Sequence, residues 1–343
     1  MILTLAEDIM DVPAAEWDAL AAQAGLYLSH QWLAAQQHDP TAQAHYALVH
    51  ADGQLIAAAP LYVVDSEPNA LYRVHDLVPD RTPVRTLLAG ARRGYLNAPL
   101  LHPRLAPDRR REALNELVAA AGSLAAAHEA RPWWLYVTDT AAAELADACG
   151  TKPVRLGEDA RIPLSGSTFD DYLAGLPSKR RVAIRRERRA FADAGYELRT
   201  LRLSECADAA GALLAQLQER HGHPADPTVM AGLLRDQADG MADSGLVLAA
   251  YAESRMVAFS LSYRHADTVW LRATGYDYAR LRGAHEYFNL VYYLPIEDAC
   301  AHGATALHLG MESLRAKTLR GAVTSPLWAV EGTGGANGRP GRL

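Results

Sequence analysis

Helix and strand signals alternate along this chain, and their order in the second half repeats the theme of the first. Each half contains amphipathic helical stretches, β-rich runs joined by tight turns, and a later helix and short strand. Mixed elements in this order indicate an α/β fold with mixed sheets. Because the chain has 343 residues, we expect two domains. The duplication is inferred from element order alone, since the two halves share no close sequence repeat.

The first half is expected to form one domain over residues 1–150. Ala51-Asp52-Gly53 lies between two β-rich runs and is a hairpin signal, and Ser29 has the residue type of a helix N-cap. The expected elements are, in order, helices beginning at Pro13 and at Ser29, strands over 44–50 and 54–64, a helix over 108–128, a strand over 133–137, and a helix over 141–148 closed by Gly150.

The second half is expected to form another domain over 151–330, with the stretch 151–157 as its boundary and a Gly-rich flexible tail over 331–343. The expected elements are helices over 168–176 and 178–194, a strand over 196–203, helices over 205–221 and 228–240, strands over 246–252, 256–264 and 268–274, a helix over 284–301, and a strand over 306–309.

Composition and charge narrow the classes of function. The net charge is −6, so a polyanion would bind only at a local basic patch. Cys149, Cys206 and Cys300 lie far apart without CxxC spacing, which argues for a reducing compartment and against a zinc site. The sequence shows no signal-peptide pattern and no stretch near the roughly 20 apolar residues of a membrane span. We therefore expect a cytoplasmic protein without a metal.

Lysine is rare, since only three of the 34 basic residues are lysines. Lys152 lies in the expected boundary, Lys179 begins a basic helix, and Lys317 stands in Gly310-x6-Lys317-x2-Arg320-Gly321 after the last expected strand. An ammonium is a compact donor that can also titrate, whereas a guanidinium is a planar fork that stays charged. This difference makes Lys317 a candidate functional residue. The alternative is that these lysines have no specific role and simply reflect the amino-acid composition of the chain.

Seven of the eleven residues from Lys179 to Arg189 are basic. At helical spacing, Ile184, Glu187 and Phe191 fall on one mostly apolar face. The opposite face carries Arg181, Arg185, Arg188 and Arg189. We expect Glu187 to pair with arginines one turn away. The basic face is suited to a polyphosphate or an RNA backbone, and the alternative is a solvated face with salt bridges.

The run from Gly275 to His285 lies between an expected strand and an expected helix. Such a basic, Gly-containing loop presents backbone N–H groups and the positive end of a helix dipole to an anion. Acyltransferases of the GNAT superfamily use a similar loop, Arg/Gln-x-x-Gly-x-Gly/Ala, for the pyrophosphate of coenzyme A. Arg280 and Gly283 match this pattern, whereas His285 departs from it and is expected to crowd a pyrophosphate. Tyr276 and Tyr278, at the end of the strand, are candidate general acids, and the alternative is that they are packing residues.

Further motifs lie at both ends of the chain. These are Leu28-Ser29-His30-x-Trp32-Leu33, Ala57-Ala58-Ala59-Pro60-Leu61-Tyr62, Tyr292-Tyr293-x2-Ile296-Glu297-x5-Gly303 and the Lys317 motif. Together they resemble a family of predicted N-acyltransferases related to the Fem-type aminoacyltransferases of peptidoglycan assembly, which contain two GNAT-like domains. The resemblance runs over most of residues 26–328. It departs at Met311-Glu312-Ser313, where the family has a Gly-Gln-Gly-Glu-type stretch, and at Ala316, where the family has His.

The resemblance implies two tandem GNAT-like domains and direct transfer of an activated acyl group to an amine. It places Lys317 at the reaction centre, where we expect it to stabilise the carbonyl oxygen or a donor phosphate. Tyr276 is the other candidate catalytic residue, because of its place at the end of a strand and not because of the resemblance. The expected donor-binding residues are Arg280, Arg282, Gly283 and His285 in the loop, and Lys179, Arg181, Arg185 and Arg188 on the basic helix.

Three functions remain open at this point. The leading one is transfer from aminoacyl-tRNA to an amine of a peptide or small molecule, in cell-wall or specialised-metabolite assembly, with tRNA as partner and no tightly bound cofactor. The second is transfer from acyl-CoA, favoured by Arg280, Gly283 and the acidic net charge. The third is a non-catalytic binding protein, favoured by the altered stretch around Met311–Ala316. The acceptor and the oligomeric state are not encoded in any pattern that we identify.

Overall fold

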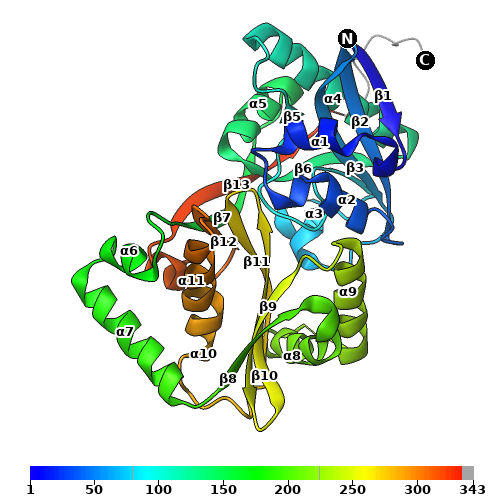
Figure 1. The fold of residues 1–343 in the computed structure, drawn as a ribbon. Helices are drawn as coiled ribbons and strands as arrows, with labels where there is room; N and C mark the ends of the chain where they lie inside the picture. The colour runs from blue at the N-terminus through cyan, green and yellow to red at the C-terminus, as the bar shows by residue number, and fades with distance from the viewer. Residues whose placement is uncertain (80, 224, 334–343) are drawn as a thin grey trace. The chain divides into compact units, whose positions relative to one another are not determined.

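The computed structural model describes residues 1–79, 81–223 and 225–333 (Figure 1). The chain divides into two compact units, one formed by residues 1–159 together with the segment from 325 onward, and the other by residues 160–324. The first unit therefore includes most of a C-terminal strand, Val323–Glu331, which the expected division between residues 150 and 151 assigned to the second domain. Of the expected tail over 331–343, residues 334–343 lie outside the described part of the chain.

The first unit contains a mixed sheet in the order β1-β2-β3-β4-β6-β13. Its strands are β1 (Ile2–Ala6), β2 (Ala42–Ala51), β3 (Gln54–Val64), β4 (Thr86–Ala89), β5 (Leu100–Leu101, paired with β3), β6 (Arg131–Thr138) and the end of β13 (Val323–Glu331). β4 and β6 run parallel, and β1, β2 and β3 form an antiparallel meander. The helices are α1 (Ala14–Ala21), α2 (His30–Gln36), α3 (Val74–Leu77), α4 (Pro107–Ala127) and α5 (Asp139–Cys149).

Helices cover both faces of this sheet. Ala47 and Val49 of β2 belong to the same apolar core as Leu117 of α4. Tyr46, next to Ala47 along β2, points to the other face and contacts Trp17 of α1 with ring centroids 5.8 Å apart. Each face therefore buries alternate side chains, as the period of a β-strand requires.

Several local expectations for the first half are confirmed. The side chain of Ser29 accepts a hydrogen bond from Trp32 N and caps α2. β2 and β3 pair as a hairpin around Asp52 and Gly53, both of which have positive φ. Gly150 ends α5 at φ 64°, in the left-handed region. Strands β1, β4 and β5 carried no sequence signal that we identified.

The second unit contains a mixed sheet in the order β7-β12-β11-β10-β9-β8. Its strands are the end of β7 (Val154–Pro163), β8 (Glu197–Arg202), β9 (Leu246–Ala252), β10 (Arg255–His265), β11 (Thr268–Tyr276) and β12 (Ala306–Gly310). β11 and β12 pair in parallel, and the chain between them forms a helical crossover. The helices are α6 (Phe169–Ala174), α7 (Ser178–Asp193), α8 (Ala207–Arg220), α9 (Pro227–Gly240), α10 (Glu286–Phe288), the π-helix η5 (Asn289–Tyr293), α11 (Leu294–Ala301) and α12 (Leu314–Thr318).

The sheet of the second unit is also covered on both faces, with α8 and α9 on one face and α10 and α11 on the other (Figure 1). Val269 of β11 packs in one core with Ile296 of α11. Gly275, further along β11, turns to the opposite face, where an added Cβ would lie 2.6 Å from the backbone of Leu213 in α8. This glycine is needed because strand and helix backbones approach each other closely there.

Candidate active site

Lys317, in α12, is buried and its side chain binds the end of β12. The residue is 4% exposed, and its Nζ atom donates to the carbonyl oxygens of Leu309 (2.9 Å), Gly310 (2.8 Å) and Met311 (2.5 Å). An ammonium has three N–H donors, so three backbone carbonyls match its capacity. The charge of Lys317 is thus directed at the turn that follows β12.

That turn is conformationally unusual. Glu312 and Ser313 both have positive φ, at 62° and 45°, and Gly310 has φ 67°. A non-glycine residue in the left-handed region costs roughly 1–2 kcal/mol, so two in succession require compensation. The three hydrogen bonds from Lys317 provide it, because they gather the carbonyl oxygens of residues 309–311 around one cation. The Met311-Glu312-Ser313 departure therefore lies in the turn that Lys317 organises.

Glu187 of α7 forms a buried network that sequence reasoning placed incorrectly. We expected it to pair with an arginine one turn away, but its Oε2 atom binds Arg320 Nη2 at 2.9 Å and accepts a hydrogen bond from Tyr293. Arg320 Nε also donates to Tyr293 Oη at 2.9 Å. The expectation was wrong because the residues three and four positions from Glu187 on α7 are Ala183, Ile184, Ala190 and Phe191, so no arginine lies one turn away.

Aromatic rings and backbone groups complete this network. The guanidinium of Arg320 lies 3.5 Å from the centroid of the Phe288 ring, and Tyr172 Oη donates to Arg320 O at 2.9 Å. Burial raises the pKa of Tyr293, and the hydrogen bond to Glu187 raises it further, so Tyr293 stays protonated. Tyr293 ends the π-helix η5, a type of distortion that is frequent at functional sites.

Tyr276 lies at the end of β11 as expected, but inside the core. Its residue is 3% exposed and its hydroxyl oxygen is 2.6 Å from Thr274 Oγ1. Burial raises its pKa well above the ordinary value of 10. The phenol is therefore neutral and can serve as a hydrogen-bond donor near neutral pH.

The loop after β11 has the expected shape of an anion-binding loop, and the anion in it is a side chain of the protein. Glu286, the first residue of α10, accepts hydrogen bonds from Arg282 N (2.8 Å) and Ala284 N (3.0 Å). Tyr196 Oη donates to the same carboxylate at 2.7 Å. Although burial opposes it, these hydrogen bonds keep the pKa of Glu286 below its ordinary value. Glu286 is thus an internal carboxylate bound where the sequence pattern indicated a phosphate.

The other side chains of the loop also contact groups of the protein itself. Arg280 pairs with Asp277 at 2.8 Å and is half-exposed. Arg282 donates to Ala194 O, and its guanidinium lies 4.9 Å from the Tyr196 ring centroid. Gly283 has φ +69°, which favours glycine there. His285 also has positive φ, at 60°, and its ring stacks on that of Phe288, with ring centroids 6.2 Å apart.

The basic helix α7 divides its cations between internal contacts and solvent. Arg181 donates to Leu176 O at 2.6 Å, and Arg188 pairs with Glu297 at 2.7 Å. Arg185 has only a distant partner, Asp170 at 3.7 Å. Lys179, Arg186 and Arg189 are exposed and have no side-chain partner within the described part of the chain. The cations of α7 available to a ligand are therefore mainly these four: Lys179, Arg185, Arg186 and Arg189.

α7 connects the candidate residues of the second unit. Its C-terminal end reaches the loop after β11, through Ala194 and Tyr196, and its inward face reaches Arg320 through Glu187. Sequence reasoning missed Glu286, Tyr293 and Arg320 as parts of the site. Glu286 could have been found as a carboxylate directly after the loop pattern, whereas the Glu187–Arg320 pair has no local signal.

Comparison with known proteins agrees with this architecture. The family model FemAB-like, described as peptidoglycan biosynthesis/recognition, matches residues 98–332, more than half of the chain. No curated protein matches the sequence. Among solved structures, FemX is 13% identical with a TM-score of 0.65, covering 96% of this chain and 97% of that chain.

Two further structures are similar to the chain. A tandem GNAT protein from the clavulanic acid biosynthesis pathway is 17% identical with a TM-score of 0.60, covering 97% of this chain and 99% of that one. A conserved protein of unknown function from Bacteroides thetaiotaomicron VPI-5482 is 13% identical with a TM-score of 0.61, covering 97% of this chain and all of that one. These likenesses confirm the expected fold of two GNAT-like domains in tandem. On the strength of the family match, the chain belongs to the FemAB-like family.

Proposed function

We propose that this protein is a Fem-type acyltransferase that takes an aminoacyl group from aminoacyl-tRNA and joins it to the amine of a peptide or small molecule. Its FemAB-like family and GNAT-like fold support an acyltransferase. In the reaction the amine nitrogen attacks the ester carbonyl, the new C–N bond forms and the ester C–O bond breaks. The ribose hydroxyl leaves with the proton that the amine loses. The site's task is to position both partners and to stabilise the oxyanion.

The observation that carries the choice of donor is the carboxylate of Glu286. Coenzyme A presents a pyrophosphate, which needs the N–H groups of such a loop. Here Arg282 N and Ala284 N donate to Glu286 instead. A pyrophosphate in the same place would lose these donors and meet a like charge, which is unfavourable. A donor without a pyrophosphate next to its acyl group avoids that conflict.

The exposed face of α7 supports tRNA as the carrier. Lys179, Arg185, Arg186 and Arg189 fall within about a third of the helix circumference at 100° per residue. The protein as a whole carries a net charge of −6, so this basic cluster is opposite in sign to the overall charge. A concentration of cations on one helix is suited to the phosphates of a nucleic-acid backbone.

We propose that Lys317 contributes to the reaction by fixing the turn after β12, to which its ammonium group is hydrogen-bonded. Because its ammonium bonds the carbonyl oxygens of residues 309–311, it fixes that segment and brings a positive charge next to it. Tyr276 is proposed as a neutral hydrogen-bond donor at the end of β11. Arg280 and Arg282, which shape the loop, are proposed as residues that orient the donor.

Transfer from acyl-CoA is the second candidate, and the order β11–loop–helix with Arg280 and Gly283 favours it. The two functions separate in one experiment. The purified protein is incubated with labelled aminoacyl-tRNA or labelled acetyl-CoA and a panel of amines, and amide formation is measured. Product from aminoacyl-tRNA alone supports the proposal, and product from acetyl-CoA alone refutes it. No product from either donor, with an amine ligand still bound, indicates a non-catalytic binding protein.

The role of Glu286 has its own test, which needs no activity. Binding of coenzyme A and of inorganic pyrophosphate is measured by calorimetry for the wild type and for Glu286→Ala. We expect no binding to the wild type and measurable binding to the variant, because Arg282 N and Ala284 N lose their internal acceptor. Glu253→Ala, at an exposed turn between β9 and β10, is the matched control. Tight binding of coenzyme A to the wild type would refute the donor assignment.

A further inference from the structure

Arg320 lies where five helical segments of the second unit meet. Its contacts are, in chain order, Tyr172 of α6, which donates to its carbonyl oxygen at 2.9 Å, Glu187 of α7, which binds Nη2 at 2.9 Å, Phe288 of α10, whose ring centroid lies 3.5 Å from Cζ, Tyr293 of η5, which accepts from Nε at 2.9 Å, and Ala316 of α12, whose carbonyl oxygen accepts from Nη1 at 3.1 Å. All of these residues belong to the second unit, so the arrangement does not depend on the first. One residue therefore joins segments that are up to 148 positions apart in the sequence.

These contacts use the shape of a guanidinium. Three different nitrogen atoms of Arg320 donate to three separate acceptors, and the flat face of the group covers an aromatic ring. A planar fork can direct its donors outward in this way, whereas an ammonium has all three donors on one nitrogen. Lys317, three positions earlier, shows the opposite case, because its single nitrogen serves three carbonyl oxygens. The two cations of the motif are therefore not interchangeable.

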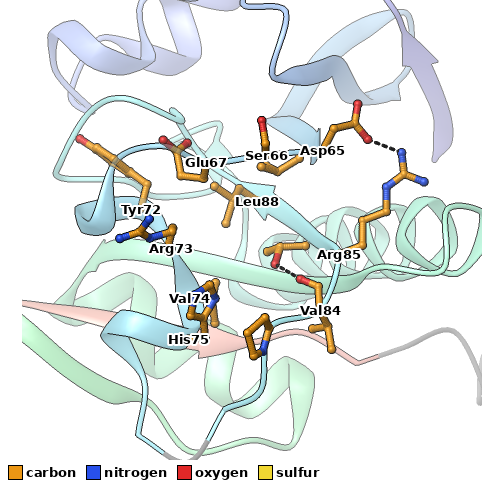
Figure 2. Close-up of a pocket in the computed structure, with 13 residues that line it drawn as sticks. Asp65, Ser66, Glu67, Tyr72, Arg73, Val74, His75, Val84, Arg85 and Leu88 are labelled. Carbon is orange, nitrogen blue, oxygen red and sulfur yellow. Dashed lines mark hydrogen bonds and ion pairs between the residues drawn. The ribbon is translucent and has the colours of Figure 1, made fainter.

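Burial distinguishes this network from the ion pairs at the surface. Figure 2 shows one of the latter, a dashed line between Asp65 and Arg85 at the wall of a cavity of about 490 Å³ in the first unit. Those side chains are 59% and 42% exposed, so water screens the pair and each partner can move with little loss. The side chains of Glu187 and Arg320 are 11% and 4% exposed, so separating them would leave a charge without solvent or partner. The buried pair therefore holds a fixed geometry.

The network continues to the turn after β12. The backbone N–H groups of Arg320 and Ala322 donate to the carbonyl oxygen of Lys317 at 2.9 and 3.1 Å. The ammonium of Lys317 in turn binds the carbonyl oxygens of residues 309–311. A continuous path of contacts thus runs from α7 to a turn in which Glu312 and Ser313 take positive φ. A backbone in that conformation persists only where the surrounding contacts hold it.

α7 carries this network on one face and exposed cations on the other. Glu187 is buried, whereas Lys179, Arg185, Arg186 and Arg189 are exposed. A helix moves as a unit because its backbone hydrogen bonds are internal. Phosphates bound to the outer face of α7 would therefore be placed at a fixed distance from the turn that Lys317 binds. Fixed placement of a donor relative to the reacting groups is a main source of rate in direct group transfer.

We propose that Arg320 is a positioning residue of the transferase: together with Glu187 and Tyr293, it fixes the turn bound by Lys317 relative to the ligand-binding face of α7. In this role Arg320 touches neither the donor nor the acceptor, since the donor's phosphates bind the other side of the helix. The inference rests on the proposed function where turnover is concerned. The mechanical link between α7 and the turn is independent of which donor the protein uses.

Hydrogen–deuterium exchange on the full chain tests this link without any activity. Tyr293→Phe removes one hydroxyl and keeps both charges paired, and Arg320→Lys keeps the charge and removes the fork. We expect the backbone amides of residues 309–322 to exchange at least about tenfold faster in both variants, because hydrogen bonds to a charged group are lost. Amides of β8 and β9, in the same unit, should change by less than about twofold.

The matched controls make the same chemical changes in the first unit. Tyr46→Phe removes a buried hydroxyl that lies 3.3 Å from Gln37, and Arg110→Lys removes a fork that binds Glu144 at 2.8 and 2.9 Å. Neither control should alter exchange over residues 309–322. Unchanged exchange there in Tyr293→Phe would overturn the proposal. Equal acceleration of 309–322, β8 and β9 would also overturn it, because such a result indicates a role in overall stability alone.

Steady-state kinetics with the donor found active gives a second readout. In Tyr293→Phe and Arg320→Lys, kcat should fall at least about tenfold while KM for the donor stays within about twofold, because the outer cations of α7 are unchanged. A wild-type kcat in both variants, or a rise in KM alone, would overturn the positioning role and leave the proposed reaction intact. Faster exchange over 309–322 in a protein that forms no product from any donor would refute the proposed reaction and keep the link.

Discussion

Glu187 and Arg320 form a buried ion pair at 2.9 Å although 133 residues separate them in the sequence. The pair links the inward face of the basic helix α7 to the segment after α12, and Tyr293 donates to the same carboxylate. It therefore joins the two motifs that first pointed to function. Its side chains are 11% and 4% exposed, so each charge depends on the other for stabilisation.

Removing one member of this pair should destabilise the protein strongly. Arg320→Ala leaves the Glu187 carboxylate buried without its cation, and we expect the free energy of unfolding to fall by about 3–5 kcal/mol. Urea unfolding measures this change. Arg185→Ala, whose partner Asp170 is 3.7 Å away at the surface, is the control and should cost no more than about 0.5 kcal/mol. Equal losses in the two variants would contradict the buried pair's role.

Lys317→Ala should reduce turnover at least about tenfold, which corresponds to roughly 1.4 kcal/mol of transition-state stabilisation. The physical reason is that three carbonyl oxygens lose the cation that gathers them. Lys317→Arg should restore little, because a planar fork cannot direct its donors to acceptors that converge on one point. Steady-state kinetics with the donor found active gives kcat and KM separately. A normal rate in a folded Lys317→Ala variant would exclude any part of Lys317 in the reaction.

Binding of tRNA should depend steeply on salt, and the exposed cations of α7 should account for that slope. Replacing Lys179, Arg186 and Arg189 by Ala removes up to three phosphate contacts, and should reduce the slope of log affinity against log salt by about 2–3. A filter-binding titration at several salt concentrations measures it. Arg181→Ala with Arg188→Ala is the comparison, because those side chains already bind Leu176 O and Glu297. A larger effect from the comparison pair would place the tRNA elsewhere on α7.

The contribution of Glu286 to stability should depend on pH. Its pKa is lower in the folded protein than its ordinary value of 4.5, so the ionised carboxylate is favoured by folding. The stabilisation is complete above pH 4.5 and is lost as pH falls through the folded pKa. We expect the difference in unfolding free energy between wild type and Glu286→Gln to shrink as pH falls below 4.5. Urea unfolding at several pH values tests this, and a difference that grows in acid would have the wrong sign.

His285→Gly should leave coenzyme A binding unchanged, because the ring of His285 stacks on Phe288 and Glu286 still occupies the loop. His285→Ala and His285→Gly both remove the ring, but only glycine takes the observed φ of 60° at little cost. The glycine variant should therefore be the more stable of the two by roughly 1 kcal/mol. Coenzyme A binding that appears with His285→Gly alone would show that the imidazole, rather than Glu286, excludes it.

Much of the fold followed from local patterns. The hairpin of β2 and β3, the caps at Ser29 and Gly150, and the helix from Ser178 all depend on residues close in sequence. The inward face of α7 was also readable, since Ile184, Glu187 and Phe191 are buried together. Such features depend on turn geometry and on the 3.6-residue period, which act within a few residues.

The sequence by itself therefore determined the fold class, the tandem plan and the presence of a basic helix and an anion-type loop. Tertiary structure decided what these features bind. Glu187 pairs with Arg320 and Arg188 pairs with Glu297, each more than 100 residues away, whereas Lys317 and Glu286 bind backbone groups within eight residues of themselves. A residue pattern fixes which face a charge lies on. Only the folded chain fixes which of many chemically equivalent partners comes within 3 Å, because that proximity is set by the packing of elements distant in sequence.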